Sequence, residues 1–136
     1  MAGLAQALSR AERGVTGRLS EALERAGCSV EQWRILLLLA DGEGHPMSEI
    51  AEFALMPAPS LTRMVDRMAT DGLVHRTIDV RDRRRVLVHL TREGRALHRS
   101  ATALVEQEGQ ALLGAGEQAD LQRLQELLEA LAGRIR

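Results

Sequence analysis

The stretch DVRDRRRVLVHLT, residues Asp79–Thr91, joins a cluster of arginines to an alternating apolar segment. Alternation of apolar and polar residues with a period of two indicates a β-strand that is buried on one face. A second short segment of this kind, LVHRTI at residues 73–78, precedes the arginines. The two segments therefore predict an antiparallel hairpin with an arginine-rich tip.

Helical patterns surround this hairpin. Apolar residues recur at steps of three and four in five segments, residues 4–25, 29–40, 59–71, 92–113 and 117–135. A shorter helix fits residues 48–54. Ser29, Ser48 and Thr91 can cap three of these helices, and Pro59 suits a first helical turn. A short helix, a break, a second helix and a hairpin in this order predict a winged helix-turn-helix.

We predict a mainly α-helical chain with a small antiparallel β-hairpin, organised as a winged helix-turn-helix with helical dimerisation extensions. Residues 1–28 would form an N-terminal dimerisation helix, residues 29–91 the DNA-binding domain and residues 92–136 the C-terminal dimerisation helices. The last helix carries an apolar stripe of Leu121, Leu124, Leu128, Leu131 and Ile135. A small winged-helix core cannot also cover this stripe, so we expect a second copy of the chain to cover it. Packing within one chain is the alternative.

Composition narrows the classes of protein. With 136 residues, the chain suits one domain with helical extensions. One Trp, one Phe and no Tyr argue against nucleic-acid binding through base stacking. The single cysteine, Cys28, cannot form an internal disulfide, which favours a reducing compartment. No signal-peptide pattern and no bilayer-spanning apolar run are visible, so we expect a cytoplasmic protein without membrane contact.

Positive charge is concentrated in one part of the chain. The formal net charge is −1, but residues 58–95 hold nine arginines and five acidic residues, which leaves a net +4 there and −5 elsewhere. Such clustering is typical of a surface that binds DNA phosphates. The alternative is a charged turn that protects a strand edge against aggregation.

The helix expected at residues 59–71 has two different faces. One face is an apolar stripe of Leu61, Met64, Val65 and Met68. The other offers hydroxyl and guanidinium groups that suit the major groove, because arginine can bind guanine through two hydrogen bonds. These candidates form the reading face, which consists of Ser60, Thr62, Arg63 and Arg67. The alternative is a solvated face on which Asp66 pairs locally with Arg63 or Thr70.

The tip of the hairpin supplies a second set of candidates, the wing arginines Arg81, Arg83, Arg84 and Arg85. Arg81 and Arg83 lie nearest its middle and could enter the minor groove, whose negative potential attracts guanidinium groups. Asp79 and Asp82 can each pair with a nearby guanidinium and hold the tip in shape.

The sequence lacks the features of enzymes and metal sites. There is no glycine-rich phosphate loop after a strand, no activated serine or cysteine and no pair of carboxylates on a pocket-lining face. We therefore expect neither an enzyme nor a cofactor. The four histidines show no metal-ligand spacing on one helix, although His75 and His89 could meet across the hairpin.

Several of these segments resemble the MarR family of bacterial winged helix-turn-helix regulators. DRRRVLVHLT (residues 82–91) resembles the wing of that family, and PSLTRMVDRMATDGLVHR (residues 59–76) resembles its recognition helix and first wing strand. SVEQWRILLLLA (residues 29–40) and SEIAEFA (residues 48–54) resemble its second helix and the first helix of its helix-turn-helix. The resemblance implies a homodimer whose first, fifth and sixth helices interlock. It also implies a pseudo-palindromic operator and, in many members, release from DNA by a small aromatic ligand.

The resemblance carries over to individual positions, namely Ser60, Thr62, Arg63 and Arg67 on the reading face and Arg81, Arg83 and Arg84 on the wing. Leu55 stands where many members have glycine in the bend of the helix-turn-helix. Some members sense peroxides through a cysteine in the first helix, whereas Cys28 lies in the first interhelical connection, so we interpret it as a small core residue. The ligand and its pocket stay unidentified; with so few aromatic residues, a pocket would be mainly aliphatic and near Trp33.

The leading hypothesis is a sequence-specific regulator of transcription, a repressor, that binds double-stranded DNA as a homodimer and is released by a small aromatic effector. The alternative is a protein-interaction module on a winged-helix scaffold that does not read DNA. A footprint with one symmetric protected site would distinguish the two.

Overall fold

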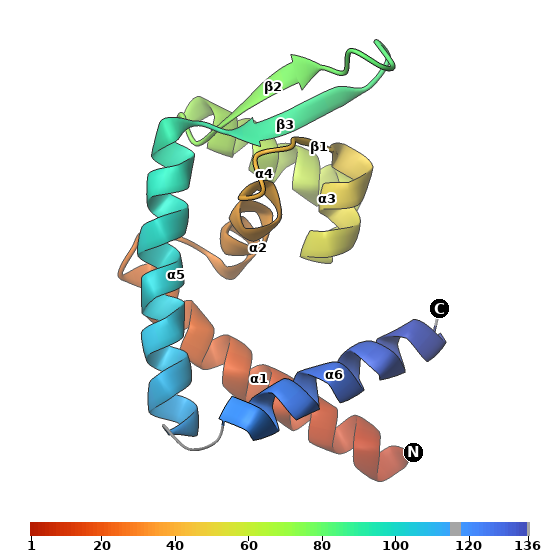
Figure 1. Ribbon diagram of the computed structural model, residues 1–136, viewed down its shortest axis with the longest axis vertical. Coiled ribbons are helices and arrows are strands. Elements are labelled where there is room, and N and C mark those ends of the chain that lie inside the picture. Colours follow the sequence, from red (N-terminus) through yellow and green to blue (C-terminus); the bar gives the residue numbers. More distant parts are fainter. Residues whose placement is uncertain (115–117, 136) are drawn as a thin grey trace. The chain divides into compact units, whose positions relative to one another are not determined.

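The computed structural model describes residues 1–114 and 118–135 and is shown in Figure 1. Its elements are α1 (Ala2–Glu24), α2 (Val30–Leu39), β1 (His45–Pro46), α3 (Met47–Ala54), α4 (Ala58–Thr70), β2 (Val74–Ile78), β3 (Val86–Leu90), α5 (Arg92–Leu113) and α6 (Gln118–Ile135). The predicted mainly helical, winged fold is confirmed. The chain forms two compact units, Met1–Val105 and Glu106–Arg136, with the boundary inside α5. The functional division at residues 28 and 91 stays a prediction.

The predicted hairpin is confirmed, and a third strand joins it. β2 and β3 pair antiparallel, from Val74 opposite Leu90 to Ile78 opposite Val86, and β1 pairs antiparallel with the other side of β3. The sequence did not reveal β1, because a strand of two residues shows no alternation and one of the two is a proline. In Figure 1 the hairpin lies beside α2, α3 and α4, and its tip extends beyond α3.

The helix-turn-helix is formed by α3 and α4. The predicted cap at Ser48 was wrong, because α3 starts one residue earlier, directly after extended Pro46, and no side chain caps it. The helix ends at Leu55, whose backbone is left-handed, with φ 57° and ψ 43°. Across the bend, the Met56 N–H donates to the carbonyl of Ala51 at 3.0 Å. This hydrogen bond satisfies a carbonyl in the last turn of α3, as expected for a left-handed helix end.

Two other predicted caps are confirmed. At α2, the Ser29 hydroxyl accepts from the Gln32 N–H at 3.1 Å, and the Gln32 side chain accepts from the Ser29 N–H at 3.0 Å. At α5, the Thr91 hydroxyl accepts from the Gly94 N–H at 3.0 Å. This first turn of α5 approaches the backbone before β2 so closely that a Cβ added at Gly94 would lie 2.0 Å from the Leu73 carbonyl oxygen.

One hydrophobic core joins the elements of the first unit. The predicted stripe on α4 is confirmed, since Leu61, Val65 and Met68 are buried and Met64 is partly buried against them. The other large, fully buried side chains are Leu23, Ile35, Leu36, Leu39, Ile50 and Val88. α4 is thus held by one face, and its opposite face stays open to solvent.

The second unit consists of the end of α5 and of α6. No residue of α6 is buried, and its exposed apolar side chains are Leu121, Leu124, Leu127, Leu128 and Ile135. The predicted last helix is confirmed from Gln118 onward, whereas its expected first residue, Glu117, lies outside the described residues. Across both units, none of the helices that the structure describes combines the length and apolarity needed to cross a membrane.

Candidate DNA-binding surface

The open side of α4 carries the reading face. Thr62, Arg63 and Arg67 are exposed, and Ser60 is half-buried. The Thr62 hydroxyl donates to the Ala58 carbonyl at 3.0 Å, so its oxygen can still accept a hydrogen bond. Neither Arg63 nor Arg67 forms an ion pair with another described residue. Both guanidinium groups can therefore bind an acceptor outside the chain.

Asp66, in the middle of α4, has a different partner from the one that local pairing would give it. Its carboxylate forms an ion pair with Arg76 Nη2 on β2 rather than with Arg63. The Thr70 hydroxyl donates to the backbone carbonyl of Asp66 at 3.0 Å. Of the two local pairs that the sequence suggested, Asp66 with Arg63 is not formed, whereas Asp66 with Thr70 is, through the Asp66 backbone carbonyl. The ion pair connects α4 to the wing and leaves the guanidinium of Arg63 unused.

Two aspartates shape the tip of the wing. Asp79 Oδ1 accepts from the Arg81 N–H at 2.9 Å, and Asp82 Oδ1 accepts from the Arg84 N–H at 3.1 Å. Asp82 also contacts Arg84 Nε at 3.5 Å. Backbone N–H groups are thus their nearest partners, where the sequence suggested guanidinium groups, because an aspartate in a turn readily bonds the N–H two residues further on. Their importance for the wing stays a prediction.

The wing arginines are all exposed, but their contacts differ. The Arg84 side chain is 94% exposed despite its contact with Asp82. Arg81 and Arg83 form no ion pair within the described part of the chain. Arg85 lies at the base of the tip, and its Nη2 is 3.9 Å from Glu49 Oε1 on α3. Three guanidinium groups therefore extend from the tip, whereas the fourth, that of Arg85, pairs with Glu49 on α3.

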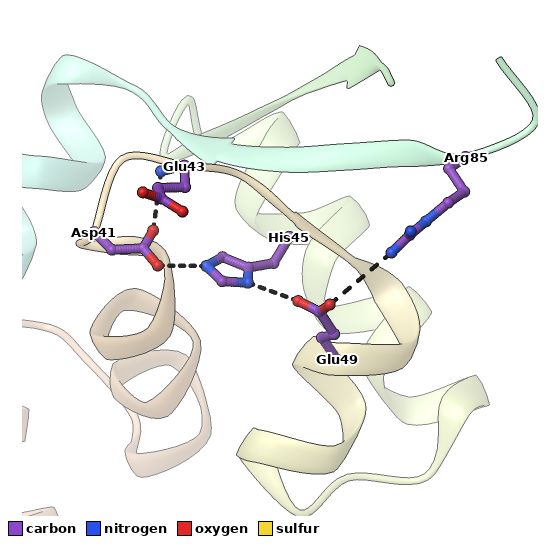
Figure 2. A network of polar contacts seen from close by, with 5 residues as sticks. All are labelled: Asp41, Glu43, His45, Glu49 and Arg85. Carbon is purple, nitrogen blue, oxygen red and sulfur yellow. Dashed lines mark hydrogen bonds and ion pairs between the residues drawn. The ribbon is translucent and has the colours of Figure 1, made fainter. Parts of the chain in front are cut away.

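Glu49 belongs to a polar network that Figure 2 shows in close-up. His45 on β1 bridges two carboxylates: its Nδ1 is 2.8 Å from Glu49 Oε2, and its Nε2 is 2.7 Å from Asp41 Oδ2. Asp41 Oδ1 in turn accepts from the Glu43 N–H at 2.9 Å. The network thus runs from the loop after α2, through β1 and α3, to Arg85 in the wing.

The protonation of this network follows from its contacts. Burial by itself lowers the pKa of His45, but the hydrogen bonds to Glu49 and Asp41 and the charges of both carboxylates raise that pKa above its usual value overall. Burial likewise acts to raise the pKa of Asp41, but the hydrogen bonds from the Glu43 N–H and from His45 lower it overall. Both shifts favour the charged forms that hold the bridge together.

The sequence carries a signal for this network in the spacing of three of its residues. Asp41 and Glu49 lie four residues before and four residues after His45. A spacing of four brings side chains together on one helix, whereas these three residues come from a loop, a strand and a helix. Among the residues that the structure describes, no cluster of three or more His, Cys, Asp or Glu side chains could hold a metal ion.

The two wing histidines meet across the hairpin, as the sequence suggested. His75 and His89 are opposite each other in the β2–β3 register, and their rings stack with centroids 5.2 Å apart. His89 Nε2 also lies 2.9 Å from the Thr77 hydroxyl. Burial, followed by the charges of His75 and His45, lowers the pKa of His89. His89 therefore favours the neutral form in the wing.

Cys28 is a buried residue between α1 and α2. Its side chain belongs to the hydrophobic core, and its Sγ donates weakly to the Ser29 carbonyl at 3.4 Å. Burial raises the pKa of the thiol to about 11. Because the thiolate is the reactive form, this environment suits a core residue better than an oxidant sensor.

Comparison with known proteins agrees with this arrangement. The MarR family profile matches residues 28–86. The chain is 31% identical over 123 residues to the homoprotocatechuate degradative operon repressor of Escherichia coli, covering 90% of this chain and 83% of the relative. Its fold is similar to that of NadR in complex with 4-hydroxyphenylacetate, with a TM-score of 0.82 and 30% identity over 93% of this chain and 89% of NadR. It is also similar to a mutant MarR from Escherichia coli in complex with operator DNA, with a TM-score of 0.81 and 25% identity over 95% and 93% of the two chains.

The profile match spans α2, the helix-turn-helix and most of the wing, and the Escherichia coli relative extends the likeness over nearly the whole chain. These are the elements that present the reading face and the wing arginines. The chain therefore belongs to the MarR family of winged helix-turn-helix transcriptional regulators, which are DNA-binding proteins and not enzymes.

Proposed function

We propose that this protein is a repressor that binds a pseudo-palindromic operator as a homodimer. The reading face on α4 would enter the major groove, and the wing arginines would contact the neighbouring minor groove and phosphates. The observation that carries the proposal is the set of exposed guanidinium groups on α4 and on the wing, two elements that the Asp66–Arg76 ion pair joins. This pair restrains α4 and β2 relative to each other, as binding of both sets to one duplex would require.

Arginine substitutions test the two roles separately. Arg63→Ala or Arg67→Ala should cost about 1–3 kcal/mol of binding free energy at particular base pairs and relax specificity there. Arg83→Ala or Arg84→Ala should weaken binding to all sequences alike and reduce the salt dependence by about one phosphate contact each. Footprinting on the DNA that flanks the coding region, followed by titrations at several salt concentrations, measures both effects.

Arg25→Ala provides the control, because Arg25 is an exposed arginine at the end of α1, outside the helix-turn-helix and the wing. It should leave affinity and specificity unchanged. If the two α4 variants and the two wing variants all lost affinity equally for every sequence, the assignment of base reading to α4 would be wrong. Salt-sensitive binding without any symmetric protected site would favour a protein-interaction module instead.

Exposed apolar side chains on α1 and α6 support the homodimer. Val15 on α1 and Leu124 on α6 are each 52% exposed, and several leucines of α6 are similarly open. Side chains of this size at regular spacing along two helices favour burial in an interface. A two-fold dimer of a helix-turn-helix protein places its two reading helices about 34–36 Å apart, which is one turn of DNA.

We further propose that a small aromatic effector binds this protein and releases it from DNA. NadR, the similar structure, was solved with 4-hydroxyphenylacetate. In this chain, Trp33 Nε1 is buried and has no hydrogen-bond partner within the described residues. A buried donor without a partner is costly, and a ligand oxygen could accept from it.

Trp33→Phe tests this role, because it removes the N–H donor and keeps an aromatic ring. An aromatic carboxylic acid or phenol that releases the wild-type protein from DNA should release the variant about fivefold less effectively, as expected for the loss of one hydrogen bond of about 1 kcal/mol. Mobility shift with a panel of such compounds measures this. Equal release of both proteins would exclude Trp33 as the donor.

A further inference from the structure

The bridge made by His45 requires a particular protonation state. A neutral imidazole has one N–H, and a carboxylate only accepts hydrogen bonds, so neutral His45 can donate to Asp41 or to Glu49 but not to both. The structure shows both contacts at hydrogen-bonding distance, 2.7 Å to Asp41 and 2.8 Å to Glu49. The observed bridge is therefore that of the imidazolium ion.

Glu49 stands between this imidazolium and the wing. Its Oε2 faces His45 at 2.8 Å, whereas its Oε1 faces Arg85 Nη2 at 3.9 Å, so the same carboxylate serves two cations (Figure 2). The distance to Arg85 is that of a loose ion pair, and the Arg85 side chain is 48% exposed. When His45 is charged, the ion pair between Glu49 and Arg85 is therefore weak.

Loss of the proton changes this balance. While His45 is protonated, the charges of Asp41, His45, Glu49 and Arg85 sum to zero. Once His45 is neutral, they sum to −1 beside a surface that must approach phosphates. At most one of the two carboxylates keeps its hydrogen bond, and the full charge of Glu49 can act on Arg85.

We propose that Glu49 is a positioning residue for the wing. Held by the His45 imidazolium, it leaves Arg85 free for a DNA phosphate; released by neutral His45, it holds Arg85 back against α3. DNA binding through the wing then takes up a proton at His45. This inference rests on the proposed function, because it requires that the wing contacts DNA.

The pH dependence expected from His45 can be distinguished from that of the titratable groups around it. Asp41 contacts His45 from the loop after α2, and Glu49 contacts it from α3. Glu43 lies in the same loop, where its backbone N–H bonds Asp41. From the sheet, His89 interacts with His45 electrostatically, and His75 stacks on His89. His89 has its pKa lowered, so it titrates on the acidic side of its usual value, whereas the pKa of His45 is raised.

The expected pH dependence has a definite sign. Since the folded protein raises the pKa of His45 above its usual value of about 6.5, the bridge is complete below that value and is lost as the pH rises through the higher, folded pKa. Affinity for DNA should therefore fall as the pH rises from below 6.5 through that higher pKa, by at most about tenfold per pH unit for each protomer. A random-sequence duplex suffices as probe, because phosphate contacts do not depend on sequence.

Binding titrations of four proteins at constant ionic strength test the proposal. The wild type should lose about three- to tenfold in affinity across this range. His45→Gln should bind with nearly the same affinity throughout, at the weak level of the wild type at high pH. Glu49→Gln should bind tightly throughout. Glu43→Gln is the matched control, because it removes the same charge from the same region without touching His45 or Arg85, and it should keep the wild-type profile.

Two further measurements exclude trivial explanations. In an Arg85→Gln background, Glu49→Gln should no longer raise affinity at high pH, because the cation that Glu49 restrains is absent. In the wild type, which needs no substitution to fold, the imidazole resonances of His45 should report a pKa that rises further when DNA is added, since linkage is reciprocal.

Several results would overturn the inference. They are an unchanged pH profile in His45→Gln, a flat profile in His75→Gln instead, equal gains from Glu43→Gln and Glu49→Gln, or a His45 pKa that DNA does not move. In each case DNA binding itself would remain, so the proposed function would stand. Absence of binding to any duplex at any pH would overturn the proposed function and this inference together.

Discussion

Leu55 holds a left-handed backbone conformation in the bend of the helix-turn-helix, with φ 57° and ψ 43°. It is the one non-glycine residue with positive φ among those that the structure describes. For an L-residue this conformation costs about 1–2 kcal/mol, and glycine avoids that cost. The side chain is 77% exposed, so its burial gives little stability in return. The bend therefore adopts the conformation that suits glycine although the chain has leucine there.

Replacing Leu55 with glycine should stabilise the fold. We expect a gain of about 0.5–1 kcal/mol, because relief of strain exceeds the extra entropy that glycine gives the unfolded chain. Urea unfolding followed by circular dichroism measures the change. Leu55→Ala serves as control: it keeps a Cβ in the left-handed region and should give no such gain. A loss of stability in Leu55→Gly would show that contacts of the leucine side chain outweigh the relief of backbone strain.

At the same scale, the sequence identified the candidate residues but not their partners. The polar face of α4 could be located because residues three and four apart share one side of a helix. The partner of Asp66 could not, since Arg76 is ten residues away and on a strand. The bridge at His45 was missed because it joins a loop, a strand and a helix.

At the scale of elements, α5 can pack against the wing because of one glycine. A Cβ at Gly94 would lie 2.0 Å from the Leu73 carbonyl oxygen, which is backbone and cannot rotate away. The same carbonyl accepts from the Thr91 N–H at 3.0 Å, so the start of α5 and the start of the wing are joined at this point.

Gly94→Ala should therefore destabilise the protein by about 1–3 kcal/mol, as overpacking of a close contact does. Gly109→Ala is the matched control on the same helix, where an added Cβ meets no atom within 4 Å. There, alanine should stabilise the helix by about 0.5–1 kcal/mol through its better propensity. Thermal and urea unfolding of the two variants compare them directly, and equal effects would show that the contact with Leu73 relaxes without cost.

At the scale of the whole molecule, the exposed apolar residues of α1 and α6 predict an obligatory partner. If that partner is a second copy, the midpoint of thermal unfolding should rise with protein concentration, because association stabilises the folded state by mass action. Sedimentation velocity at micromolar concentration should show a dimer. A concentration-independent midpoint together with a monomeric species would contradict the proposal.

A pair of substitutions on α6 sharpens this test. Leu124→Arg places a charge among the exposed leucines and should weaken dimerisation by about a hundredfold or more, since a buried leucine contributes about 1.5–3 kcal/mol and occurs twice in a symmetric interface. Gln122→Arg, at an exposed polar position that bonds Glu126, should leave the dimer intact. Comparing the two by sedimentation separates the apolar stripe from the helix as a whole.

The sequence by itself determined the order of helices and strands, the caps at Ser29 and Thr91, the buried stripe of α4 and the concentration of arginine at the wing tip. These features could be predicted because each depends on residues within about a turn or a hairpin of one another. Only the tertiary structure decided the pairing of β1 with β3, the left-handed backbone at Leu55, and the ion pairs that join α4 and α3 to the wing. The physical reason is that these features arise when segments distant in the chain pack together, and no local periodicity encodes which side chains or backbones will then meet.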